Sequence, residues 1–383
     1  MKILVVAQYQ NDGSPTAIFI HDQMKAYVRA GHEVVAIAPV AIAKRNWRGE
    51  RLSLRTRKCD IDGIRHVFPR YLSLSRYGTK NFGSDSAILA IKAQFPAILE
   101  GFQPDVIHAH TLGFGSEVGA WLKEKLGCPL VVTTHGSDTF VPFHLDRKAD
   151  LRNYAQKADT VVCVSSLLRR KLEECGVATP MCTILNGFDI SYVARDTQKE
   201  PNYVIQVGSL IPRKKTDITI RAIANLRKKN KDIRFTSVGA GMERERLEML
   251  CAELEITDIV TFTGQISNQE VQQKMSEATF FVMPSVNEGF GIVYLEAMAA
   301  GCVVIGTEGE GIADLVVNGE NGFLVPADDE GAVADVIQAC MDDPQRTAAI
   351  AARGSASAQK LTWEYNAKQY QVLFEDLVKG ASL

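Results

Sequence analysis

The sequence predicts two α/β domains, each built on a doubly wound parallel sheet, and three observations support this fold class. The chain has 383 residues, which suits two domains of about 150–200 residues better than one core. Short apolar runs bounded by turn residues alternate with longer amphipathic segments along most of the chain. The alternation starts again after residues 194–202, whose sequence ARDTQKEPN is typical of a linker.

In the first half, apolar runs rich in valine and isoleucine predict strands, and amphipathic stretches predict the helices between them. The predicted strands are 2–7, 33–39, 64–68, 105–110, 129–135, 160–165 and 182–186. The predicted helices are 16–30, 84–100, 115–126 and 166–175. We expect these elements to form an N-terminal Rossmann-like domain over residues 1–193.

The second half repeats the plan and predicts a C-terminal Rossmann-like domain over residues 203–360. Its predicted strands are 203–208, 233–239, 259–264, 279–285, 302–307 and 322–326. A closing helix within 361–383 carries Trp363, Tyr370 and Phe374, and we expect it to pack back on the first domain. Ligands bind at the carboxyl ends of parallel strands, so the cleft between the two domains is the expected site.

Composition indicates a globular protein, with 46% apolar residues, 23% charged residues and a formal net charge of −2. The opening MKILVVAQYQ has too short an apolar run for a signal peptide, and the chain offers no span of about 18 apolar residues. We therefore expect a cytoplasmic protein. The eight cysteines form no C-x-x-C pair, which favours buried reduced thiols over a disulfide or zinc framework.

Charge is unevenly distributed along the chain. Residues 1–195 hold 25 Lys and Arg against 18 Asp and Glu, whereas the remainder holds 18 against 27. Seven of the basic residues lie within 43–58, between Trp47, Leu52 and Leu54. Clustered cations with interspersed apolar groups fit the anionic inner face of a membrane. The alternative is an ordinary solvated loop; no nucleic-acid-binding motif accompanies the segment, so no nucleic acid partner is expected.

The segment NEGFGIVYLEAMAAG, residues 287–301, follows a predicted strand and opens a helix. Glycines at 289 and 291 let a backbone approach a ligand and leave N–H groups free at the helix start, where an anion such as a phosphate is favoured. Glu288 and Glu296 could accept hydrogen bonds from the hydroxyls of a sugar or a ribose. The alternative is that Glu288 caps the helix and Glu296 pairs with a basic neighbour.

The pattern E-G-F-G-x-x-x-L-E-A-M-A-x-G resembles the signature of family 4 glycosyltransferases, retaining enzymes of the GT-B type. Further motifs follow in the family's order along nearly the whole chain, densely in the second half and loosely in the first. These motifs are GHEV (31–34), DVIHAH (105–110), TTHGSD (133–138), NGFD (186–189), VGSLIPRKK (207–215), SVGAGMERERL (237–247), GEGIADLV (309–316) and NGENGFLVP (318–326). The chain is most similar to enzymes that build cell-surface polysaccharides, such as the teichuronic-acid type.

The resemblance implies a role for each matching residue. Glu288 would contact hydroxyls of the transferred sugar near the reacting face, and Glu296 would hold the ribose hydroxyls. Lys214, with Arg213, would neutralise the diphosphate as it leaves, so that no metal ion or other cofactor is expected. A fixed cation there makes physical sense because the leaving group gains negative charge in the transition state. The alternative for RKK is a solvated turn.

The remaining donor-binding residues implied by the resemblance lie beside these two motifs. They are Gly208, Ser209, Gly289, Phe290 and Gly291. The family commonly has Arg at the position of Ser209, which leaves Arg213 and Lys214 to hold the phosphates. Such a departure puts the usual phosphate contact at that position in doubt.

Histidines and a loop are implied to face the ligand from the first domain. His135 matches the family histidine that approaches the donor sugar from the opposite domain. The first-domain loop, which would approach the donor and acceptor, includes Gly13, Thr16 and His110. His108 and His110 alternate on one predicted strand and so point to one face; they could suggest a metal, but no Asp-x-Asp lies near them.

The sequence thus predicts a retaining, metal-independent hexosyltransferase that moves a sugar from a nucleoside diphosphate sugar, a UDP-sugar by preference, to a cell-surface glycan or lipid-linked acceptor. An epimerase or glycoside phosphorylase of the same fold is an alternative, as is a non-catalytic nucleotide-sugar binder. An oxidoreductase is disfavoured because no G-x-G-x-x-G follows the first strand.

Overall fold

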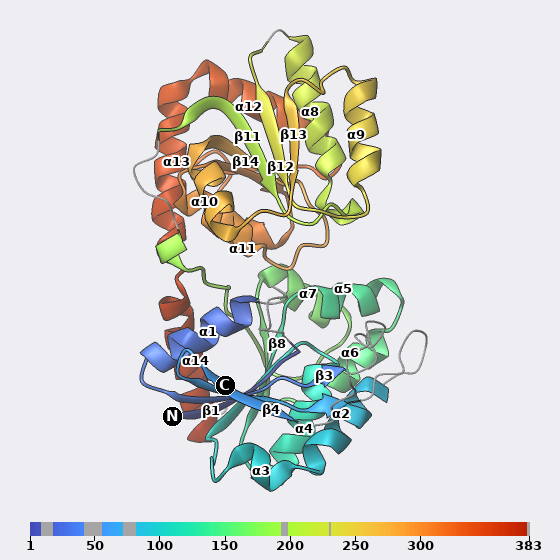
Figure 1. The fold of residues 1–383 in the computed structure, drawn as a ribbon, viewed down its shortest axis with the longest axis vertical. Coiled ribbons are helices and arrows are strands. Elements are labelled where there is room, and N and C mark those ends of the chain that lie inside the picture. The colour runs from blue at the N-terminus through green and yellow to red at the C-terminus, as the bar shows by residue number, and fades with distance from the viewer. Residues whose placement is uncertain (9–17, 42–55, 72–81, 193–197, 230, 381–383) are drawn as a thin grey trace. The chain divides into compact units, whose positions relative to one another are not determined.

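The structure, a computed structural model, describes residues 1–8, 18–41, 56–71, 82–192, 198–229 and 231–380 (Figure 1). The chain divides into two compact units. The first domain comprises Met1–Leu185 with Trp363–Leu383, and the second comprises Asn186–Thr362. Each is built on a large, mainly parallel sheet with helices packed against it, which confirms the predicted pair of doubly wound α/β domains.

The first domain is built on an eight-stranded sheet in the order β10-β9-β8-β7-β1-β2-β5-β4. Its strands are β1 (Lys2–Val6), β2 (Glu33–Ile37), β4 (Arg57–Ile61), β5 (Ile64–Phe68), β7 (Val106–His110), β8 (Leu130–Thr134), β9 (Thr160–Cys163) and β10 (Met181–Thr183). All neighbours pair in parallel except β4, which pairs antiparallel with β5. A separate pair joins β3 (Val40–Ala41) to β6 (Arg70–Tyr71). The strand order reverses between β1 and β7, so a ligand site is expected there.

The helices of the first domain fill the connections and add the C-terminal segment. They are α1 (Ile18–Arg29), α2 (Phe82–Lys92), α3 (Phe95–Leu99), α4 (Phe114–Leu126), α5 (Ser137–His144), α6 (Lys148–Ala155), α7 (Ser166–Glu174) and α14 (Trp363–Val378). Helix α14 packs against α1 (Figure 1). The rings of Tyr370 and Phe374 contact the ring of Tyr27 there. The single helix predicted over 84–100 is wrong: α2 ends at Lys92, because Pro96 has no backbone N–H to continue the ladder.

The second domain is built on a six-stranded, fully parallel sheet in the order β13-β12-β11-β14-β15-β16. Its strands are β11 (Glu200–Val207), β12 (Arg234–Val238), β13 (Val260–Gly264), β14 (Ala278–Val282), β15 (Val303–Thr307) and β16 (Phe323–Val325). This order reverses between β11 and β14, as in nucleotide-binding sheets. The predicted linker 194–202 is partly wrong, because Glu200 already pairs with Ala278 in the sheet.

The second domain is completed by its helices, which are α8 (Thr216–Lys228), α9 (Arg244–Glu253), α10 (Asn268–Glu277), α11 (Ile292–Ala299), α12 (Glu330–Asp342) and α13 (Pro344–Ala358). Helix α8 packs against α9 and α12, and α11 packs against α10 and α13 (Figure 1). Several begin at a cap that the sequence supplies, such as the reciprocal Ser267 and Glu270 bonds before α10. Throughout the described ranges, the helices are too short or too polar to cross a lipid bilayer.

Candidate functional site

The candidate site of the second domain lies where its strand order reverses. Strand β11 leads into Gly208 and Ser209, and β14 leads into the loop before α11, so both predicted motifs leave the carboxyl ends of adjacent strands. The backbones of Gly208 and Gly239 are in close contact. A Cβ on Gly239 would lie 2.0 Å from the carbonyl oxygen of Gly208. This close packing fixes the chain direction after β11, and glycine is required at 239.

A short 3-10 turn, Pro212–Lys214, positions the two predicted cations. The buried amide of Gln206, on β11, donates to the carbonyl oxygen of Lys214 at 2.9 Å. The backbone N–H of Val286 donates to the carbonyl oxygen of Arg213, also at 2.9 Å. These two bonds hold the turn against β11 and against the loop that carries Glu288.

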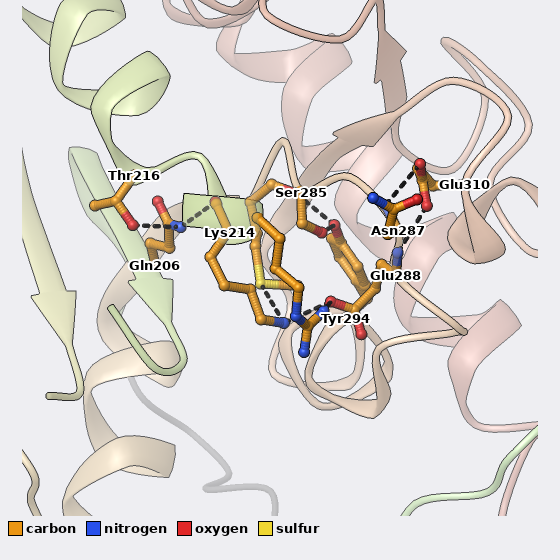
Figure 2. Close-up of polar contacts among 10 residues, drawn as sticks. Gln206, Lys214, Thr216, Ser285, Asn287, Glu288, Tyr294 and Glu310 are labelled. Atoms are coloured by element: carbon orange, nitrogen blue, oxygen red, sulfur yellow. Dashed lines mark hydrogen bonds and ion pairs between the residues drawn. The ribbon is translucent and has the colours of Figure 1, made fainter. Parts of the chain in front are cut away.

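Lys214 and Arg213 converge on one carboxylate oxygen. The Oε2 of Glu288 lies 2.6 Å from the Nζ of Lys214 and 3.0 Å from an Nη of Arg213, and Figure 2 shows Lys214 and Glu288 pointing toward each other. The side chains of Lys214 and Glu288 are each 11% exposed, whereas that of Arg213 is 43% exposed. Two cations share one anion, so this cluster keeps a surplus positive charge that suits a bound anion.

The loop that carries Glu288 is held by Glu310, a residue that the sequence did not single out. The carboxylate of Glu310 accepts hydrogen bonds from the backbone N–H groups of Asn287, at 3.0 Å, and Glu288, at 2.7 Å (Figure 2). Asn287 has a φ of 53°, a left-handed conformation that asparagine tolerates. Burial raises the pKa of Glu310, the two N–H bonds oppose this, and the nearby charge of Glu288 adds to it.

Two glycines, Gly291 in this loop and Gly311 in the segment after β15, are required by contacts that leave no room for a side chain. A Cβ on Gly311 would lie 2.1 Å from the carbonyl oxygen of Gly289, and one on Gly291 would lie 2.7 Å from the ring of Tyr294. Gly291 also has a φ of 80° at the start of α11. The close approach of two backbones therefore sets the shape of the loop.

Tyr294, also missed from the sequence, anchors the first turn of α11. Its hydroxyl donates to the carbonyl oxygen of Met283 and lies 3.2 Å from the Oγ of Ser285 (Figure 2). The ring is fully buried, and burial raises the pKa of its hydroxyl, so Tyr294 is neutral. Its position explains how a helix with no side-chain cap is fixed at its start.

The other predicted donor-binding residues fall into different environments. Ser209 is exposed after β11, and Glu296 is half-buried on α11 and engaged with other residues. Phe290 is 1% exposed, so its side chain belongs to the core and only its backbone faces the loop. The structure brings Arg213, Lys214 and Glu288 into direct contact.

In the first domain, the ring of His110, at the end of β7, contacts those of His108, on the same strand, and His135, in the loop after β8. The ring centroids of His108 and His110 lie 4.3 Å apart, and those of His110 and His135 lie 5.2 Å apart. The Nδ1 of His110 and the Nε2 of His135 form a hydrogen bond of 3.0 Å. His108 is held separately by Thr133, at 2.8 Å, and by the hydroxyl of Tyr27, at 3.2 Å.

These imidazoles are neutral at neutral pH. Burial lowers the pKa of His108 to about 3 and that of His110 well below its usual range. Burial likewise lowers the pKa of His135 to about 4, against the opposing charge of Asp138. Asp138 in turn fixes the loop after β8, because its Oδ1 accepts the backbone N–H groups of His135 and Gly136 at 3.0 and 2.9 Å.

Some predictions fall outside the described residues. Gly13 and Thr16 lie there, as does most of the basic segment 43–58. Its last two residues are on β4, where Lys58 pairs with Glu100 and Arg57 lies over the ring of Phe68. Within the described ranges, no group of three or more His, Cys, Asp or Glu side chains is arranged to hold a metal ion.

Comparisons with known proteins match both halves of the chain. A family profile described as "Glycosyltransferase Family 4" matches residues 16–192, and one described as "Glycosyl transferases group 1" matches residues 192–356. An uncharacterized glycosyltransferase of Methanocaldococcus jannaschii is 28% identical, covering 73% of this chain and 78% of that protein. The putative colanic acid biosynthesis glycosyltransferase WcaL of Escherichia coli is 26% identical, covering 84% and 86%.

Solved structures of similar fold include the Anabaena protein HepE in complex with UDP-glucose. Its TM-score is 0.75 at 23% identity, with 98% of this chain and 100% of that chain covered. At this identity the likeness establishes the fold alone, which is the GT-B fold of two Rossmann-like α/β domains. The two family profiles together span residues 16–356, so the first half of the chain is similar to family 4 glycosyltransferases and the second half to group 1 glycosyl transferases.

Proposed function

We propose that this protein transfers a sugar from a UDP-sugar to a cell-surface glycan or lipid-linked acceptor, with retention of the anomeric configuration. The observation that carries the proposal is the convergence of Lys214 and Arg213 on Glu288 at the strand reversal of the second domain. A nucleoside diphosphate sugar suits this place because it combines an anion with hydroxyl groups. HepE, of the same fold, was solved with UDP-glucose, and WcaL bears the name of a polysaccharide biosynthesis enzyme.

Glu288 changes partners when the donor binds. Without a ligand, its carboxylate neutralises part of the charge of Lys214 and Arg213. A diphosphate carries more negative charge than one carboxylate, so it competes well for the two cations. Glu288 is then free to accept hydrogen bonds from sugar hydroxyls, while Glu296 on α11 takes the ribose hydroxyls.

The reaction breaks the bond between the anomeric carbon and the β-phosphate oxygen. Negative charge develops on that oxygen in the transition state, and Lys214 stabilises it because its ammonium is fixed and mostly shielded from water. The acceptor hydroxyl forms its new bond on the same face that UDP leaves, and its proton passes to the departing phosphate oxygen. Since the two cations carry the charge, the reaction requires no metal ion.

Arg213 binds the phosphates in place of the arginine that much of the family has directly after the position of Gly208. Ser209 occupies that position here and brings no charge. The Arg213 guanidinium is 43% exposed, so it can turn from Glu288 toward a phosphate at small cost. His135 contributes a neutral imidazole from the first domain, and residues 43–58 contact an anionic membrane that carries the acceptor.

The proposal is tested by measuring sugar transfer from a panel of UDP-sugars to undecaprenyl-phosphate-linked and oligosaccharide acceptors. Lys214→Met should lower kcat/KM by about 100-fold or more, the usual loss when a fixed group that stabilises transition-state charge is removed. Lys215→Met is the matched control, because Lys215 is the next residue and its Nζ pairs instead with Asp328 at 2.5 Å. It should retain most activity.

The same assay separates the proposed reaction from its alternatives. Transfer with the anomeric configuration kept, and no requirement for added divalent cations, supports the proposal. Isomerised sugar and free UDP without an acceptor would indicate an epimerase instead. Full transfer by Lys214→Met would contradict the assigned role of the cation cluster.

A further inference from the structure

Lys214 lies in a turn whose backbone is bonded to a buried side chain of the neighbouring strand. Gln206, on β11, is 3% exposed and stands one residue before the VGSLIPRKK motif. We infer that Gln206 is a positioning residue: its amide holds the peptide group that follows Lys214 and so sets the direction from which the lysine reaches a bound diphosphate. The diphosphate as ligand rests on the proposed function. The contacts that position the turn all lie within the second domain.

The orientation of the Gln206 amide follows from its neighbours (Figure 2). The carbonyl oxygen of Lys214 lies 2.9 Å from the amide, and a carbonyl oxygen can only accept a hydrogen bond. The NH2 group must therefore face Lys214, where it also donates to the hydroxyl oxygen of Thr216 at 3.1 Å. The amide oxygen accepts from the hydroxyl of the buried Thr219, at 3.0 Å. The Gln206 amide thus directs its N–H groups at the turn and its oxygen at α8.

Both peptide groups that flank the Cα of Lys214 are held by hydrogen bonds from other elements. The backbone N–H of Val286 donates to the carbonyl oxygen of Arg213, in the peptide group before it, at 2.9 Å. Gln206 donates to the carbonyl oxygen of Lys214 itself, in the peptide group after it. A residue has only two soft backbone dihedrals, and these two bonds restrain both of them. The direction in which the side chain of Lys214 leaves the backbone is therefore fixed.

The peptide group after Lys214 needs a restraint because the next residue is strained. Lys215 has a φ of 50°, a left-handed conformation that residues with a Cβ avoid. Rotation of the peptide group between Lys214 and Lys215 would relieve that strain and would turn the carbonyl oxygen of Lys214 away. The N–H of Lys215 opposes the rotation by donating to the carbonyl oxygen of Pro212, at 3.2 Å. The bond from Gln206 is shorter and shielded from water, so it is the main restraint.

The side chain of Lys214 carries this restraint from the turn to the ammonium group. A Cβ on Gly208 would lie 3.6 Å from the Cε of Lys214. Its Nζ lies 3.6 Å from the sulfur of Met283 and 2.6 Å from the Oε2 of Glu288. A rotation at the base of so long a side chain moves the ammonium away from these contacts. A cation stabilises a diphosphate best when it is already in place, so Gln206 acts on ligand binding through Lys214.

Calorimetric titration of the full-length protein with UDP and with uridine tests the positioning role. Gln206→Met keeps the length of the side chain and removes its N–H groups. Thr219→Val is the matched control, because it removes a buried hydrogen bond from the same amide while the Lys214 carbonyl still dictates the orientation of that amide. We expect Gln206→Met to bind UDP about tenfold more weakly, the order of one lost hydrogen bond, and to bind uridine as the wild type does. Thr219→Val should bind both ligands as the wild type does.

Urea denaturation separates positioning from stability. Both substitutions remove buried hydrogen bonds, so both should lower the urea midpoint, whereas only Gln206→Met should lower UDP affinity. Equal UDP affinity in the wild type and Gln206→Met would overturn the inference, as would an equal loss of affinity in Thr219→Val.

Crystal structures of the ligand-free wild type and of Gln206→Met provide a test that requires no ligand. We expect the peptide group after Lys214 to be rotated in the variant and the ion pair between Lys214 and Glu288 to be broken. An unchanged turn in Gln206→Met would overturn the inference. Absence of UDP binding by the wild type would instead refute the proposed function, because the two crystal structures still report on the turn.

Discussion

The candidate polar groups of the two domains differ in how their side chains are accommodated in the folded protein. In the second domain, Lys214 and Arg213 form ion pairs with Glu288 at 2.6 and 3.0 Å. In the first domain, His110 and His135 become neutral, and each retains a nitrogen without a hydrogen bond to a described residue. The polar groups of the second domain are thus stabilised by ion pairing, and those of the first by loss of charge.

The largest expected effect is a difference in acid sensitivity. All seven histidines lie in the first domain, and the pKa values of His66 and His135 are lowered to about 4 and that of His108 to about 3. The unfolded chain binds these protons near pH 6.5, so the stability is present above pH 6.5 and lost as the pH falls toward 4. At pH 4, each of these histidines lowers the free energy of unfolding by on the order of 2–3 kcal/mol relative to neutral pH.

Amide hydrogen exchange measured from pH 7 to pH 4 tests this difference, after correction for the intrinsic exchange rate. Peptides of the first domain should lose protection, whereas those of the second domain should hold it. In the second domain the pKa of Glu310 is raised by burial, so its desolvation cost falls as the pH falls. His66→Leu should flatten the pH dependence, and the exposed His144→Leu should leave it unchanged. Equal loss of protection in both domains would contradict the account.

A second expected effect concerns the backbone contact beneath the Glu288 loop. Gly311→Ala places a Cβ 2.1 Å from the carbonyl oxygen of Gly289, so the backbone must shift. We expect a loss of about 3 kcal/mol in the free energy of unfolding, measured by urea denaturation. Gly309→Ala is the control, because a Cβ on Gly309 would meet open space; its φ of 75° is less favourable for alanine, so the substitution should cost about 1 kcal/mol. Equal costs would show that the contact is not tight.

A smaller effect is expected at Glu310. Glu310→Gln replaces a carboxylate that accepts from two backbone N–H groups with an amide that has one oxygen, so one N–H loses its partner. The Glu288 loop then moves, and we expect about a tenfold fall in kcat/KM. Glu308→Gln, two residues earlier, should leave transfer unchanged. An unchanged kcat/KM in Glu310→Gln would show that Glu310 does not support the site.

The smallest effect is a gain of affinity. In the free protein, Glu288 competes with the diphosphate for Lys214 and Arg213. Glu288→Gln removes this competition, so UDP should bind a few-fold more tightly while sugar transfer falls, consistent with about 1 kcal/mol for a partly exposed ion pair. Weaker UDP binding in Glu288→Gln would show that the carboxylate supports the cations and does not compete for them.

The fold and the two motifs of the second domain could be predicted from sequence because their signals are local. Short apolar runs locate the strands to within a few residues, and glycine spacing locates the loop before α11. The helix over 84–100 was wrong because its apolar periodicity continues through Pro96, and periodicity does not register a missing N–H.

The contacts between the motifs could not be predicted, because they depend on how distant loops meet. Glu310 bonds the N–H groups of Asn287 and Glu288, more than twenty residues earlier. A signal did exist: residues 308–311 follow β15, which neighbours β14, and the carboxyl ends of adjacent parallel strands meet. Tyr294 gave no such signal, since a tyrosine on an apolar helix face is indistinguishable from ordinary core.

We propose that Lys214 and Arg213 bind the diphosphate of the donor in place of the Glu288 carboxylate. Isothermal titration calorimetry with UDP and with uridine tests it directly on the full chain. We expect UDP to bind the wild type far more tightly than uridine, and Lys214→Met to lose about 100-fold in UDP affinity, close to 3 kcal/mol, while uridine binding is unchanged. Equal UDP affinity in wild type and Lys214→Met would contradict the account.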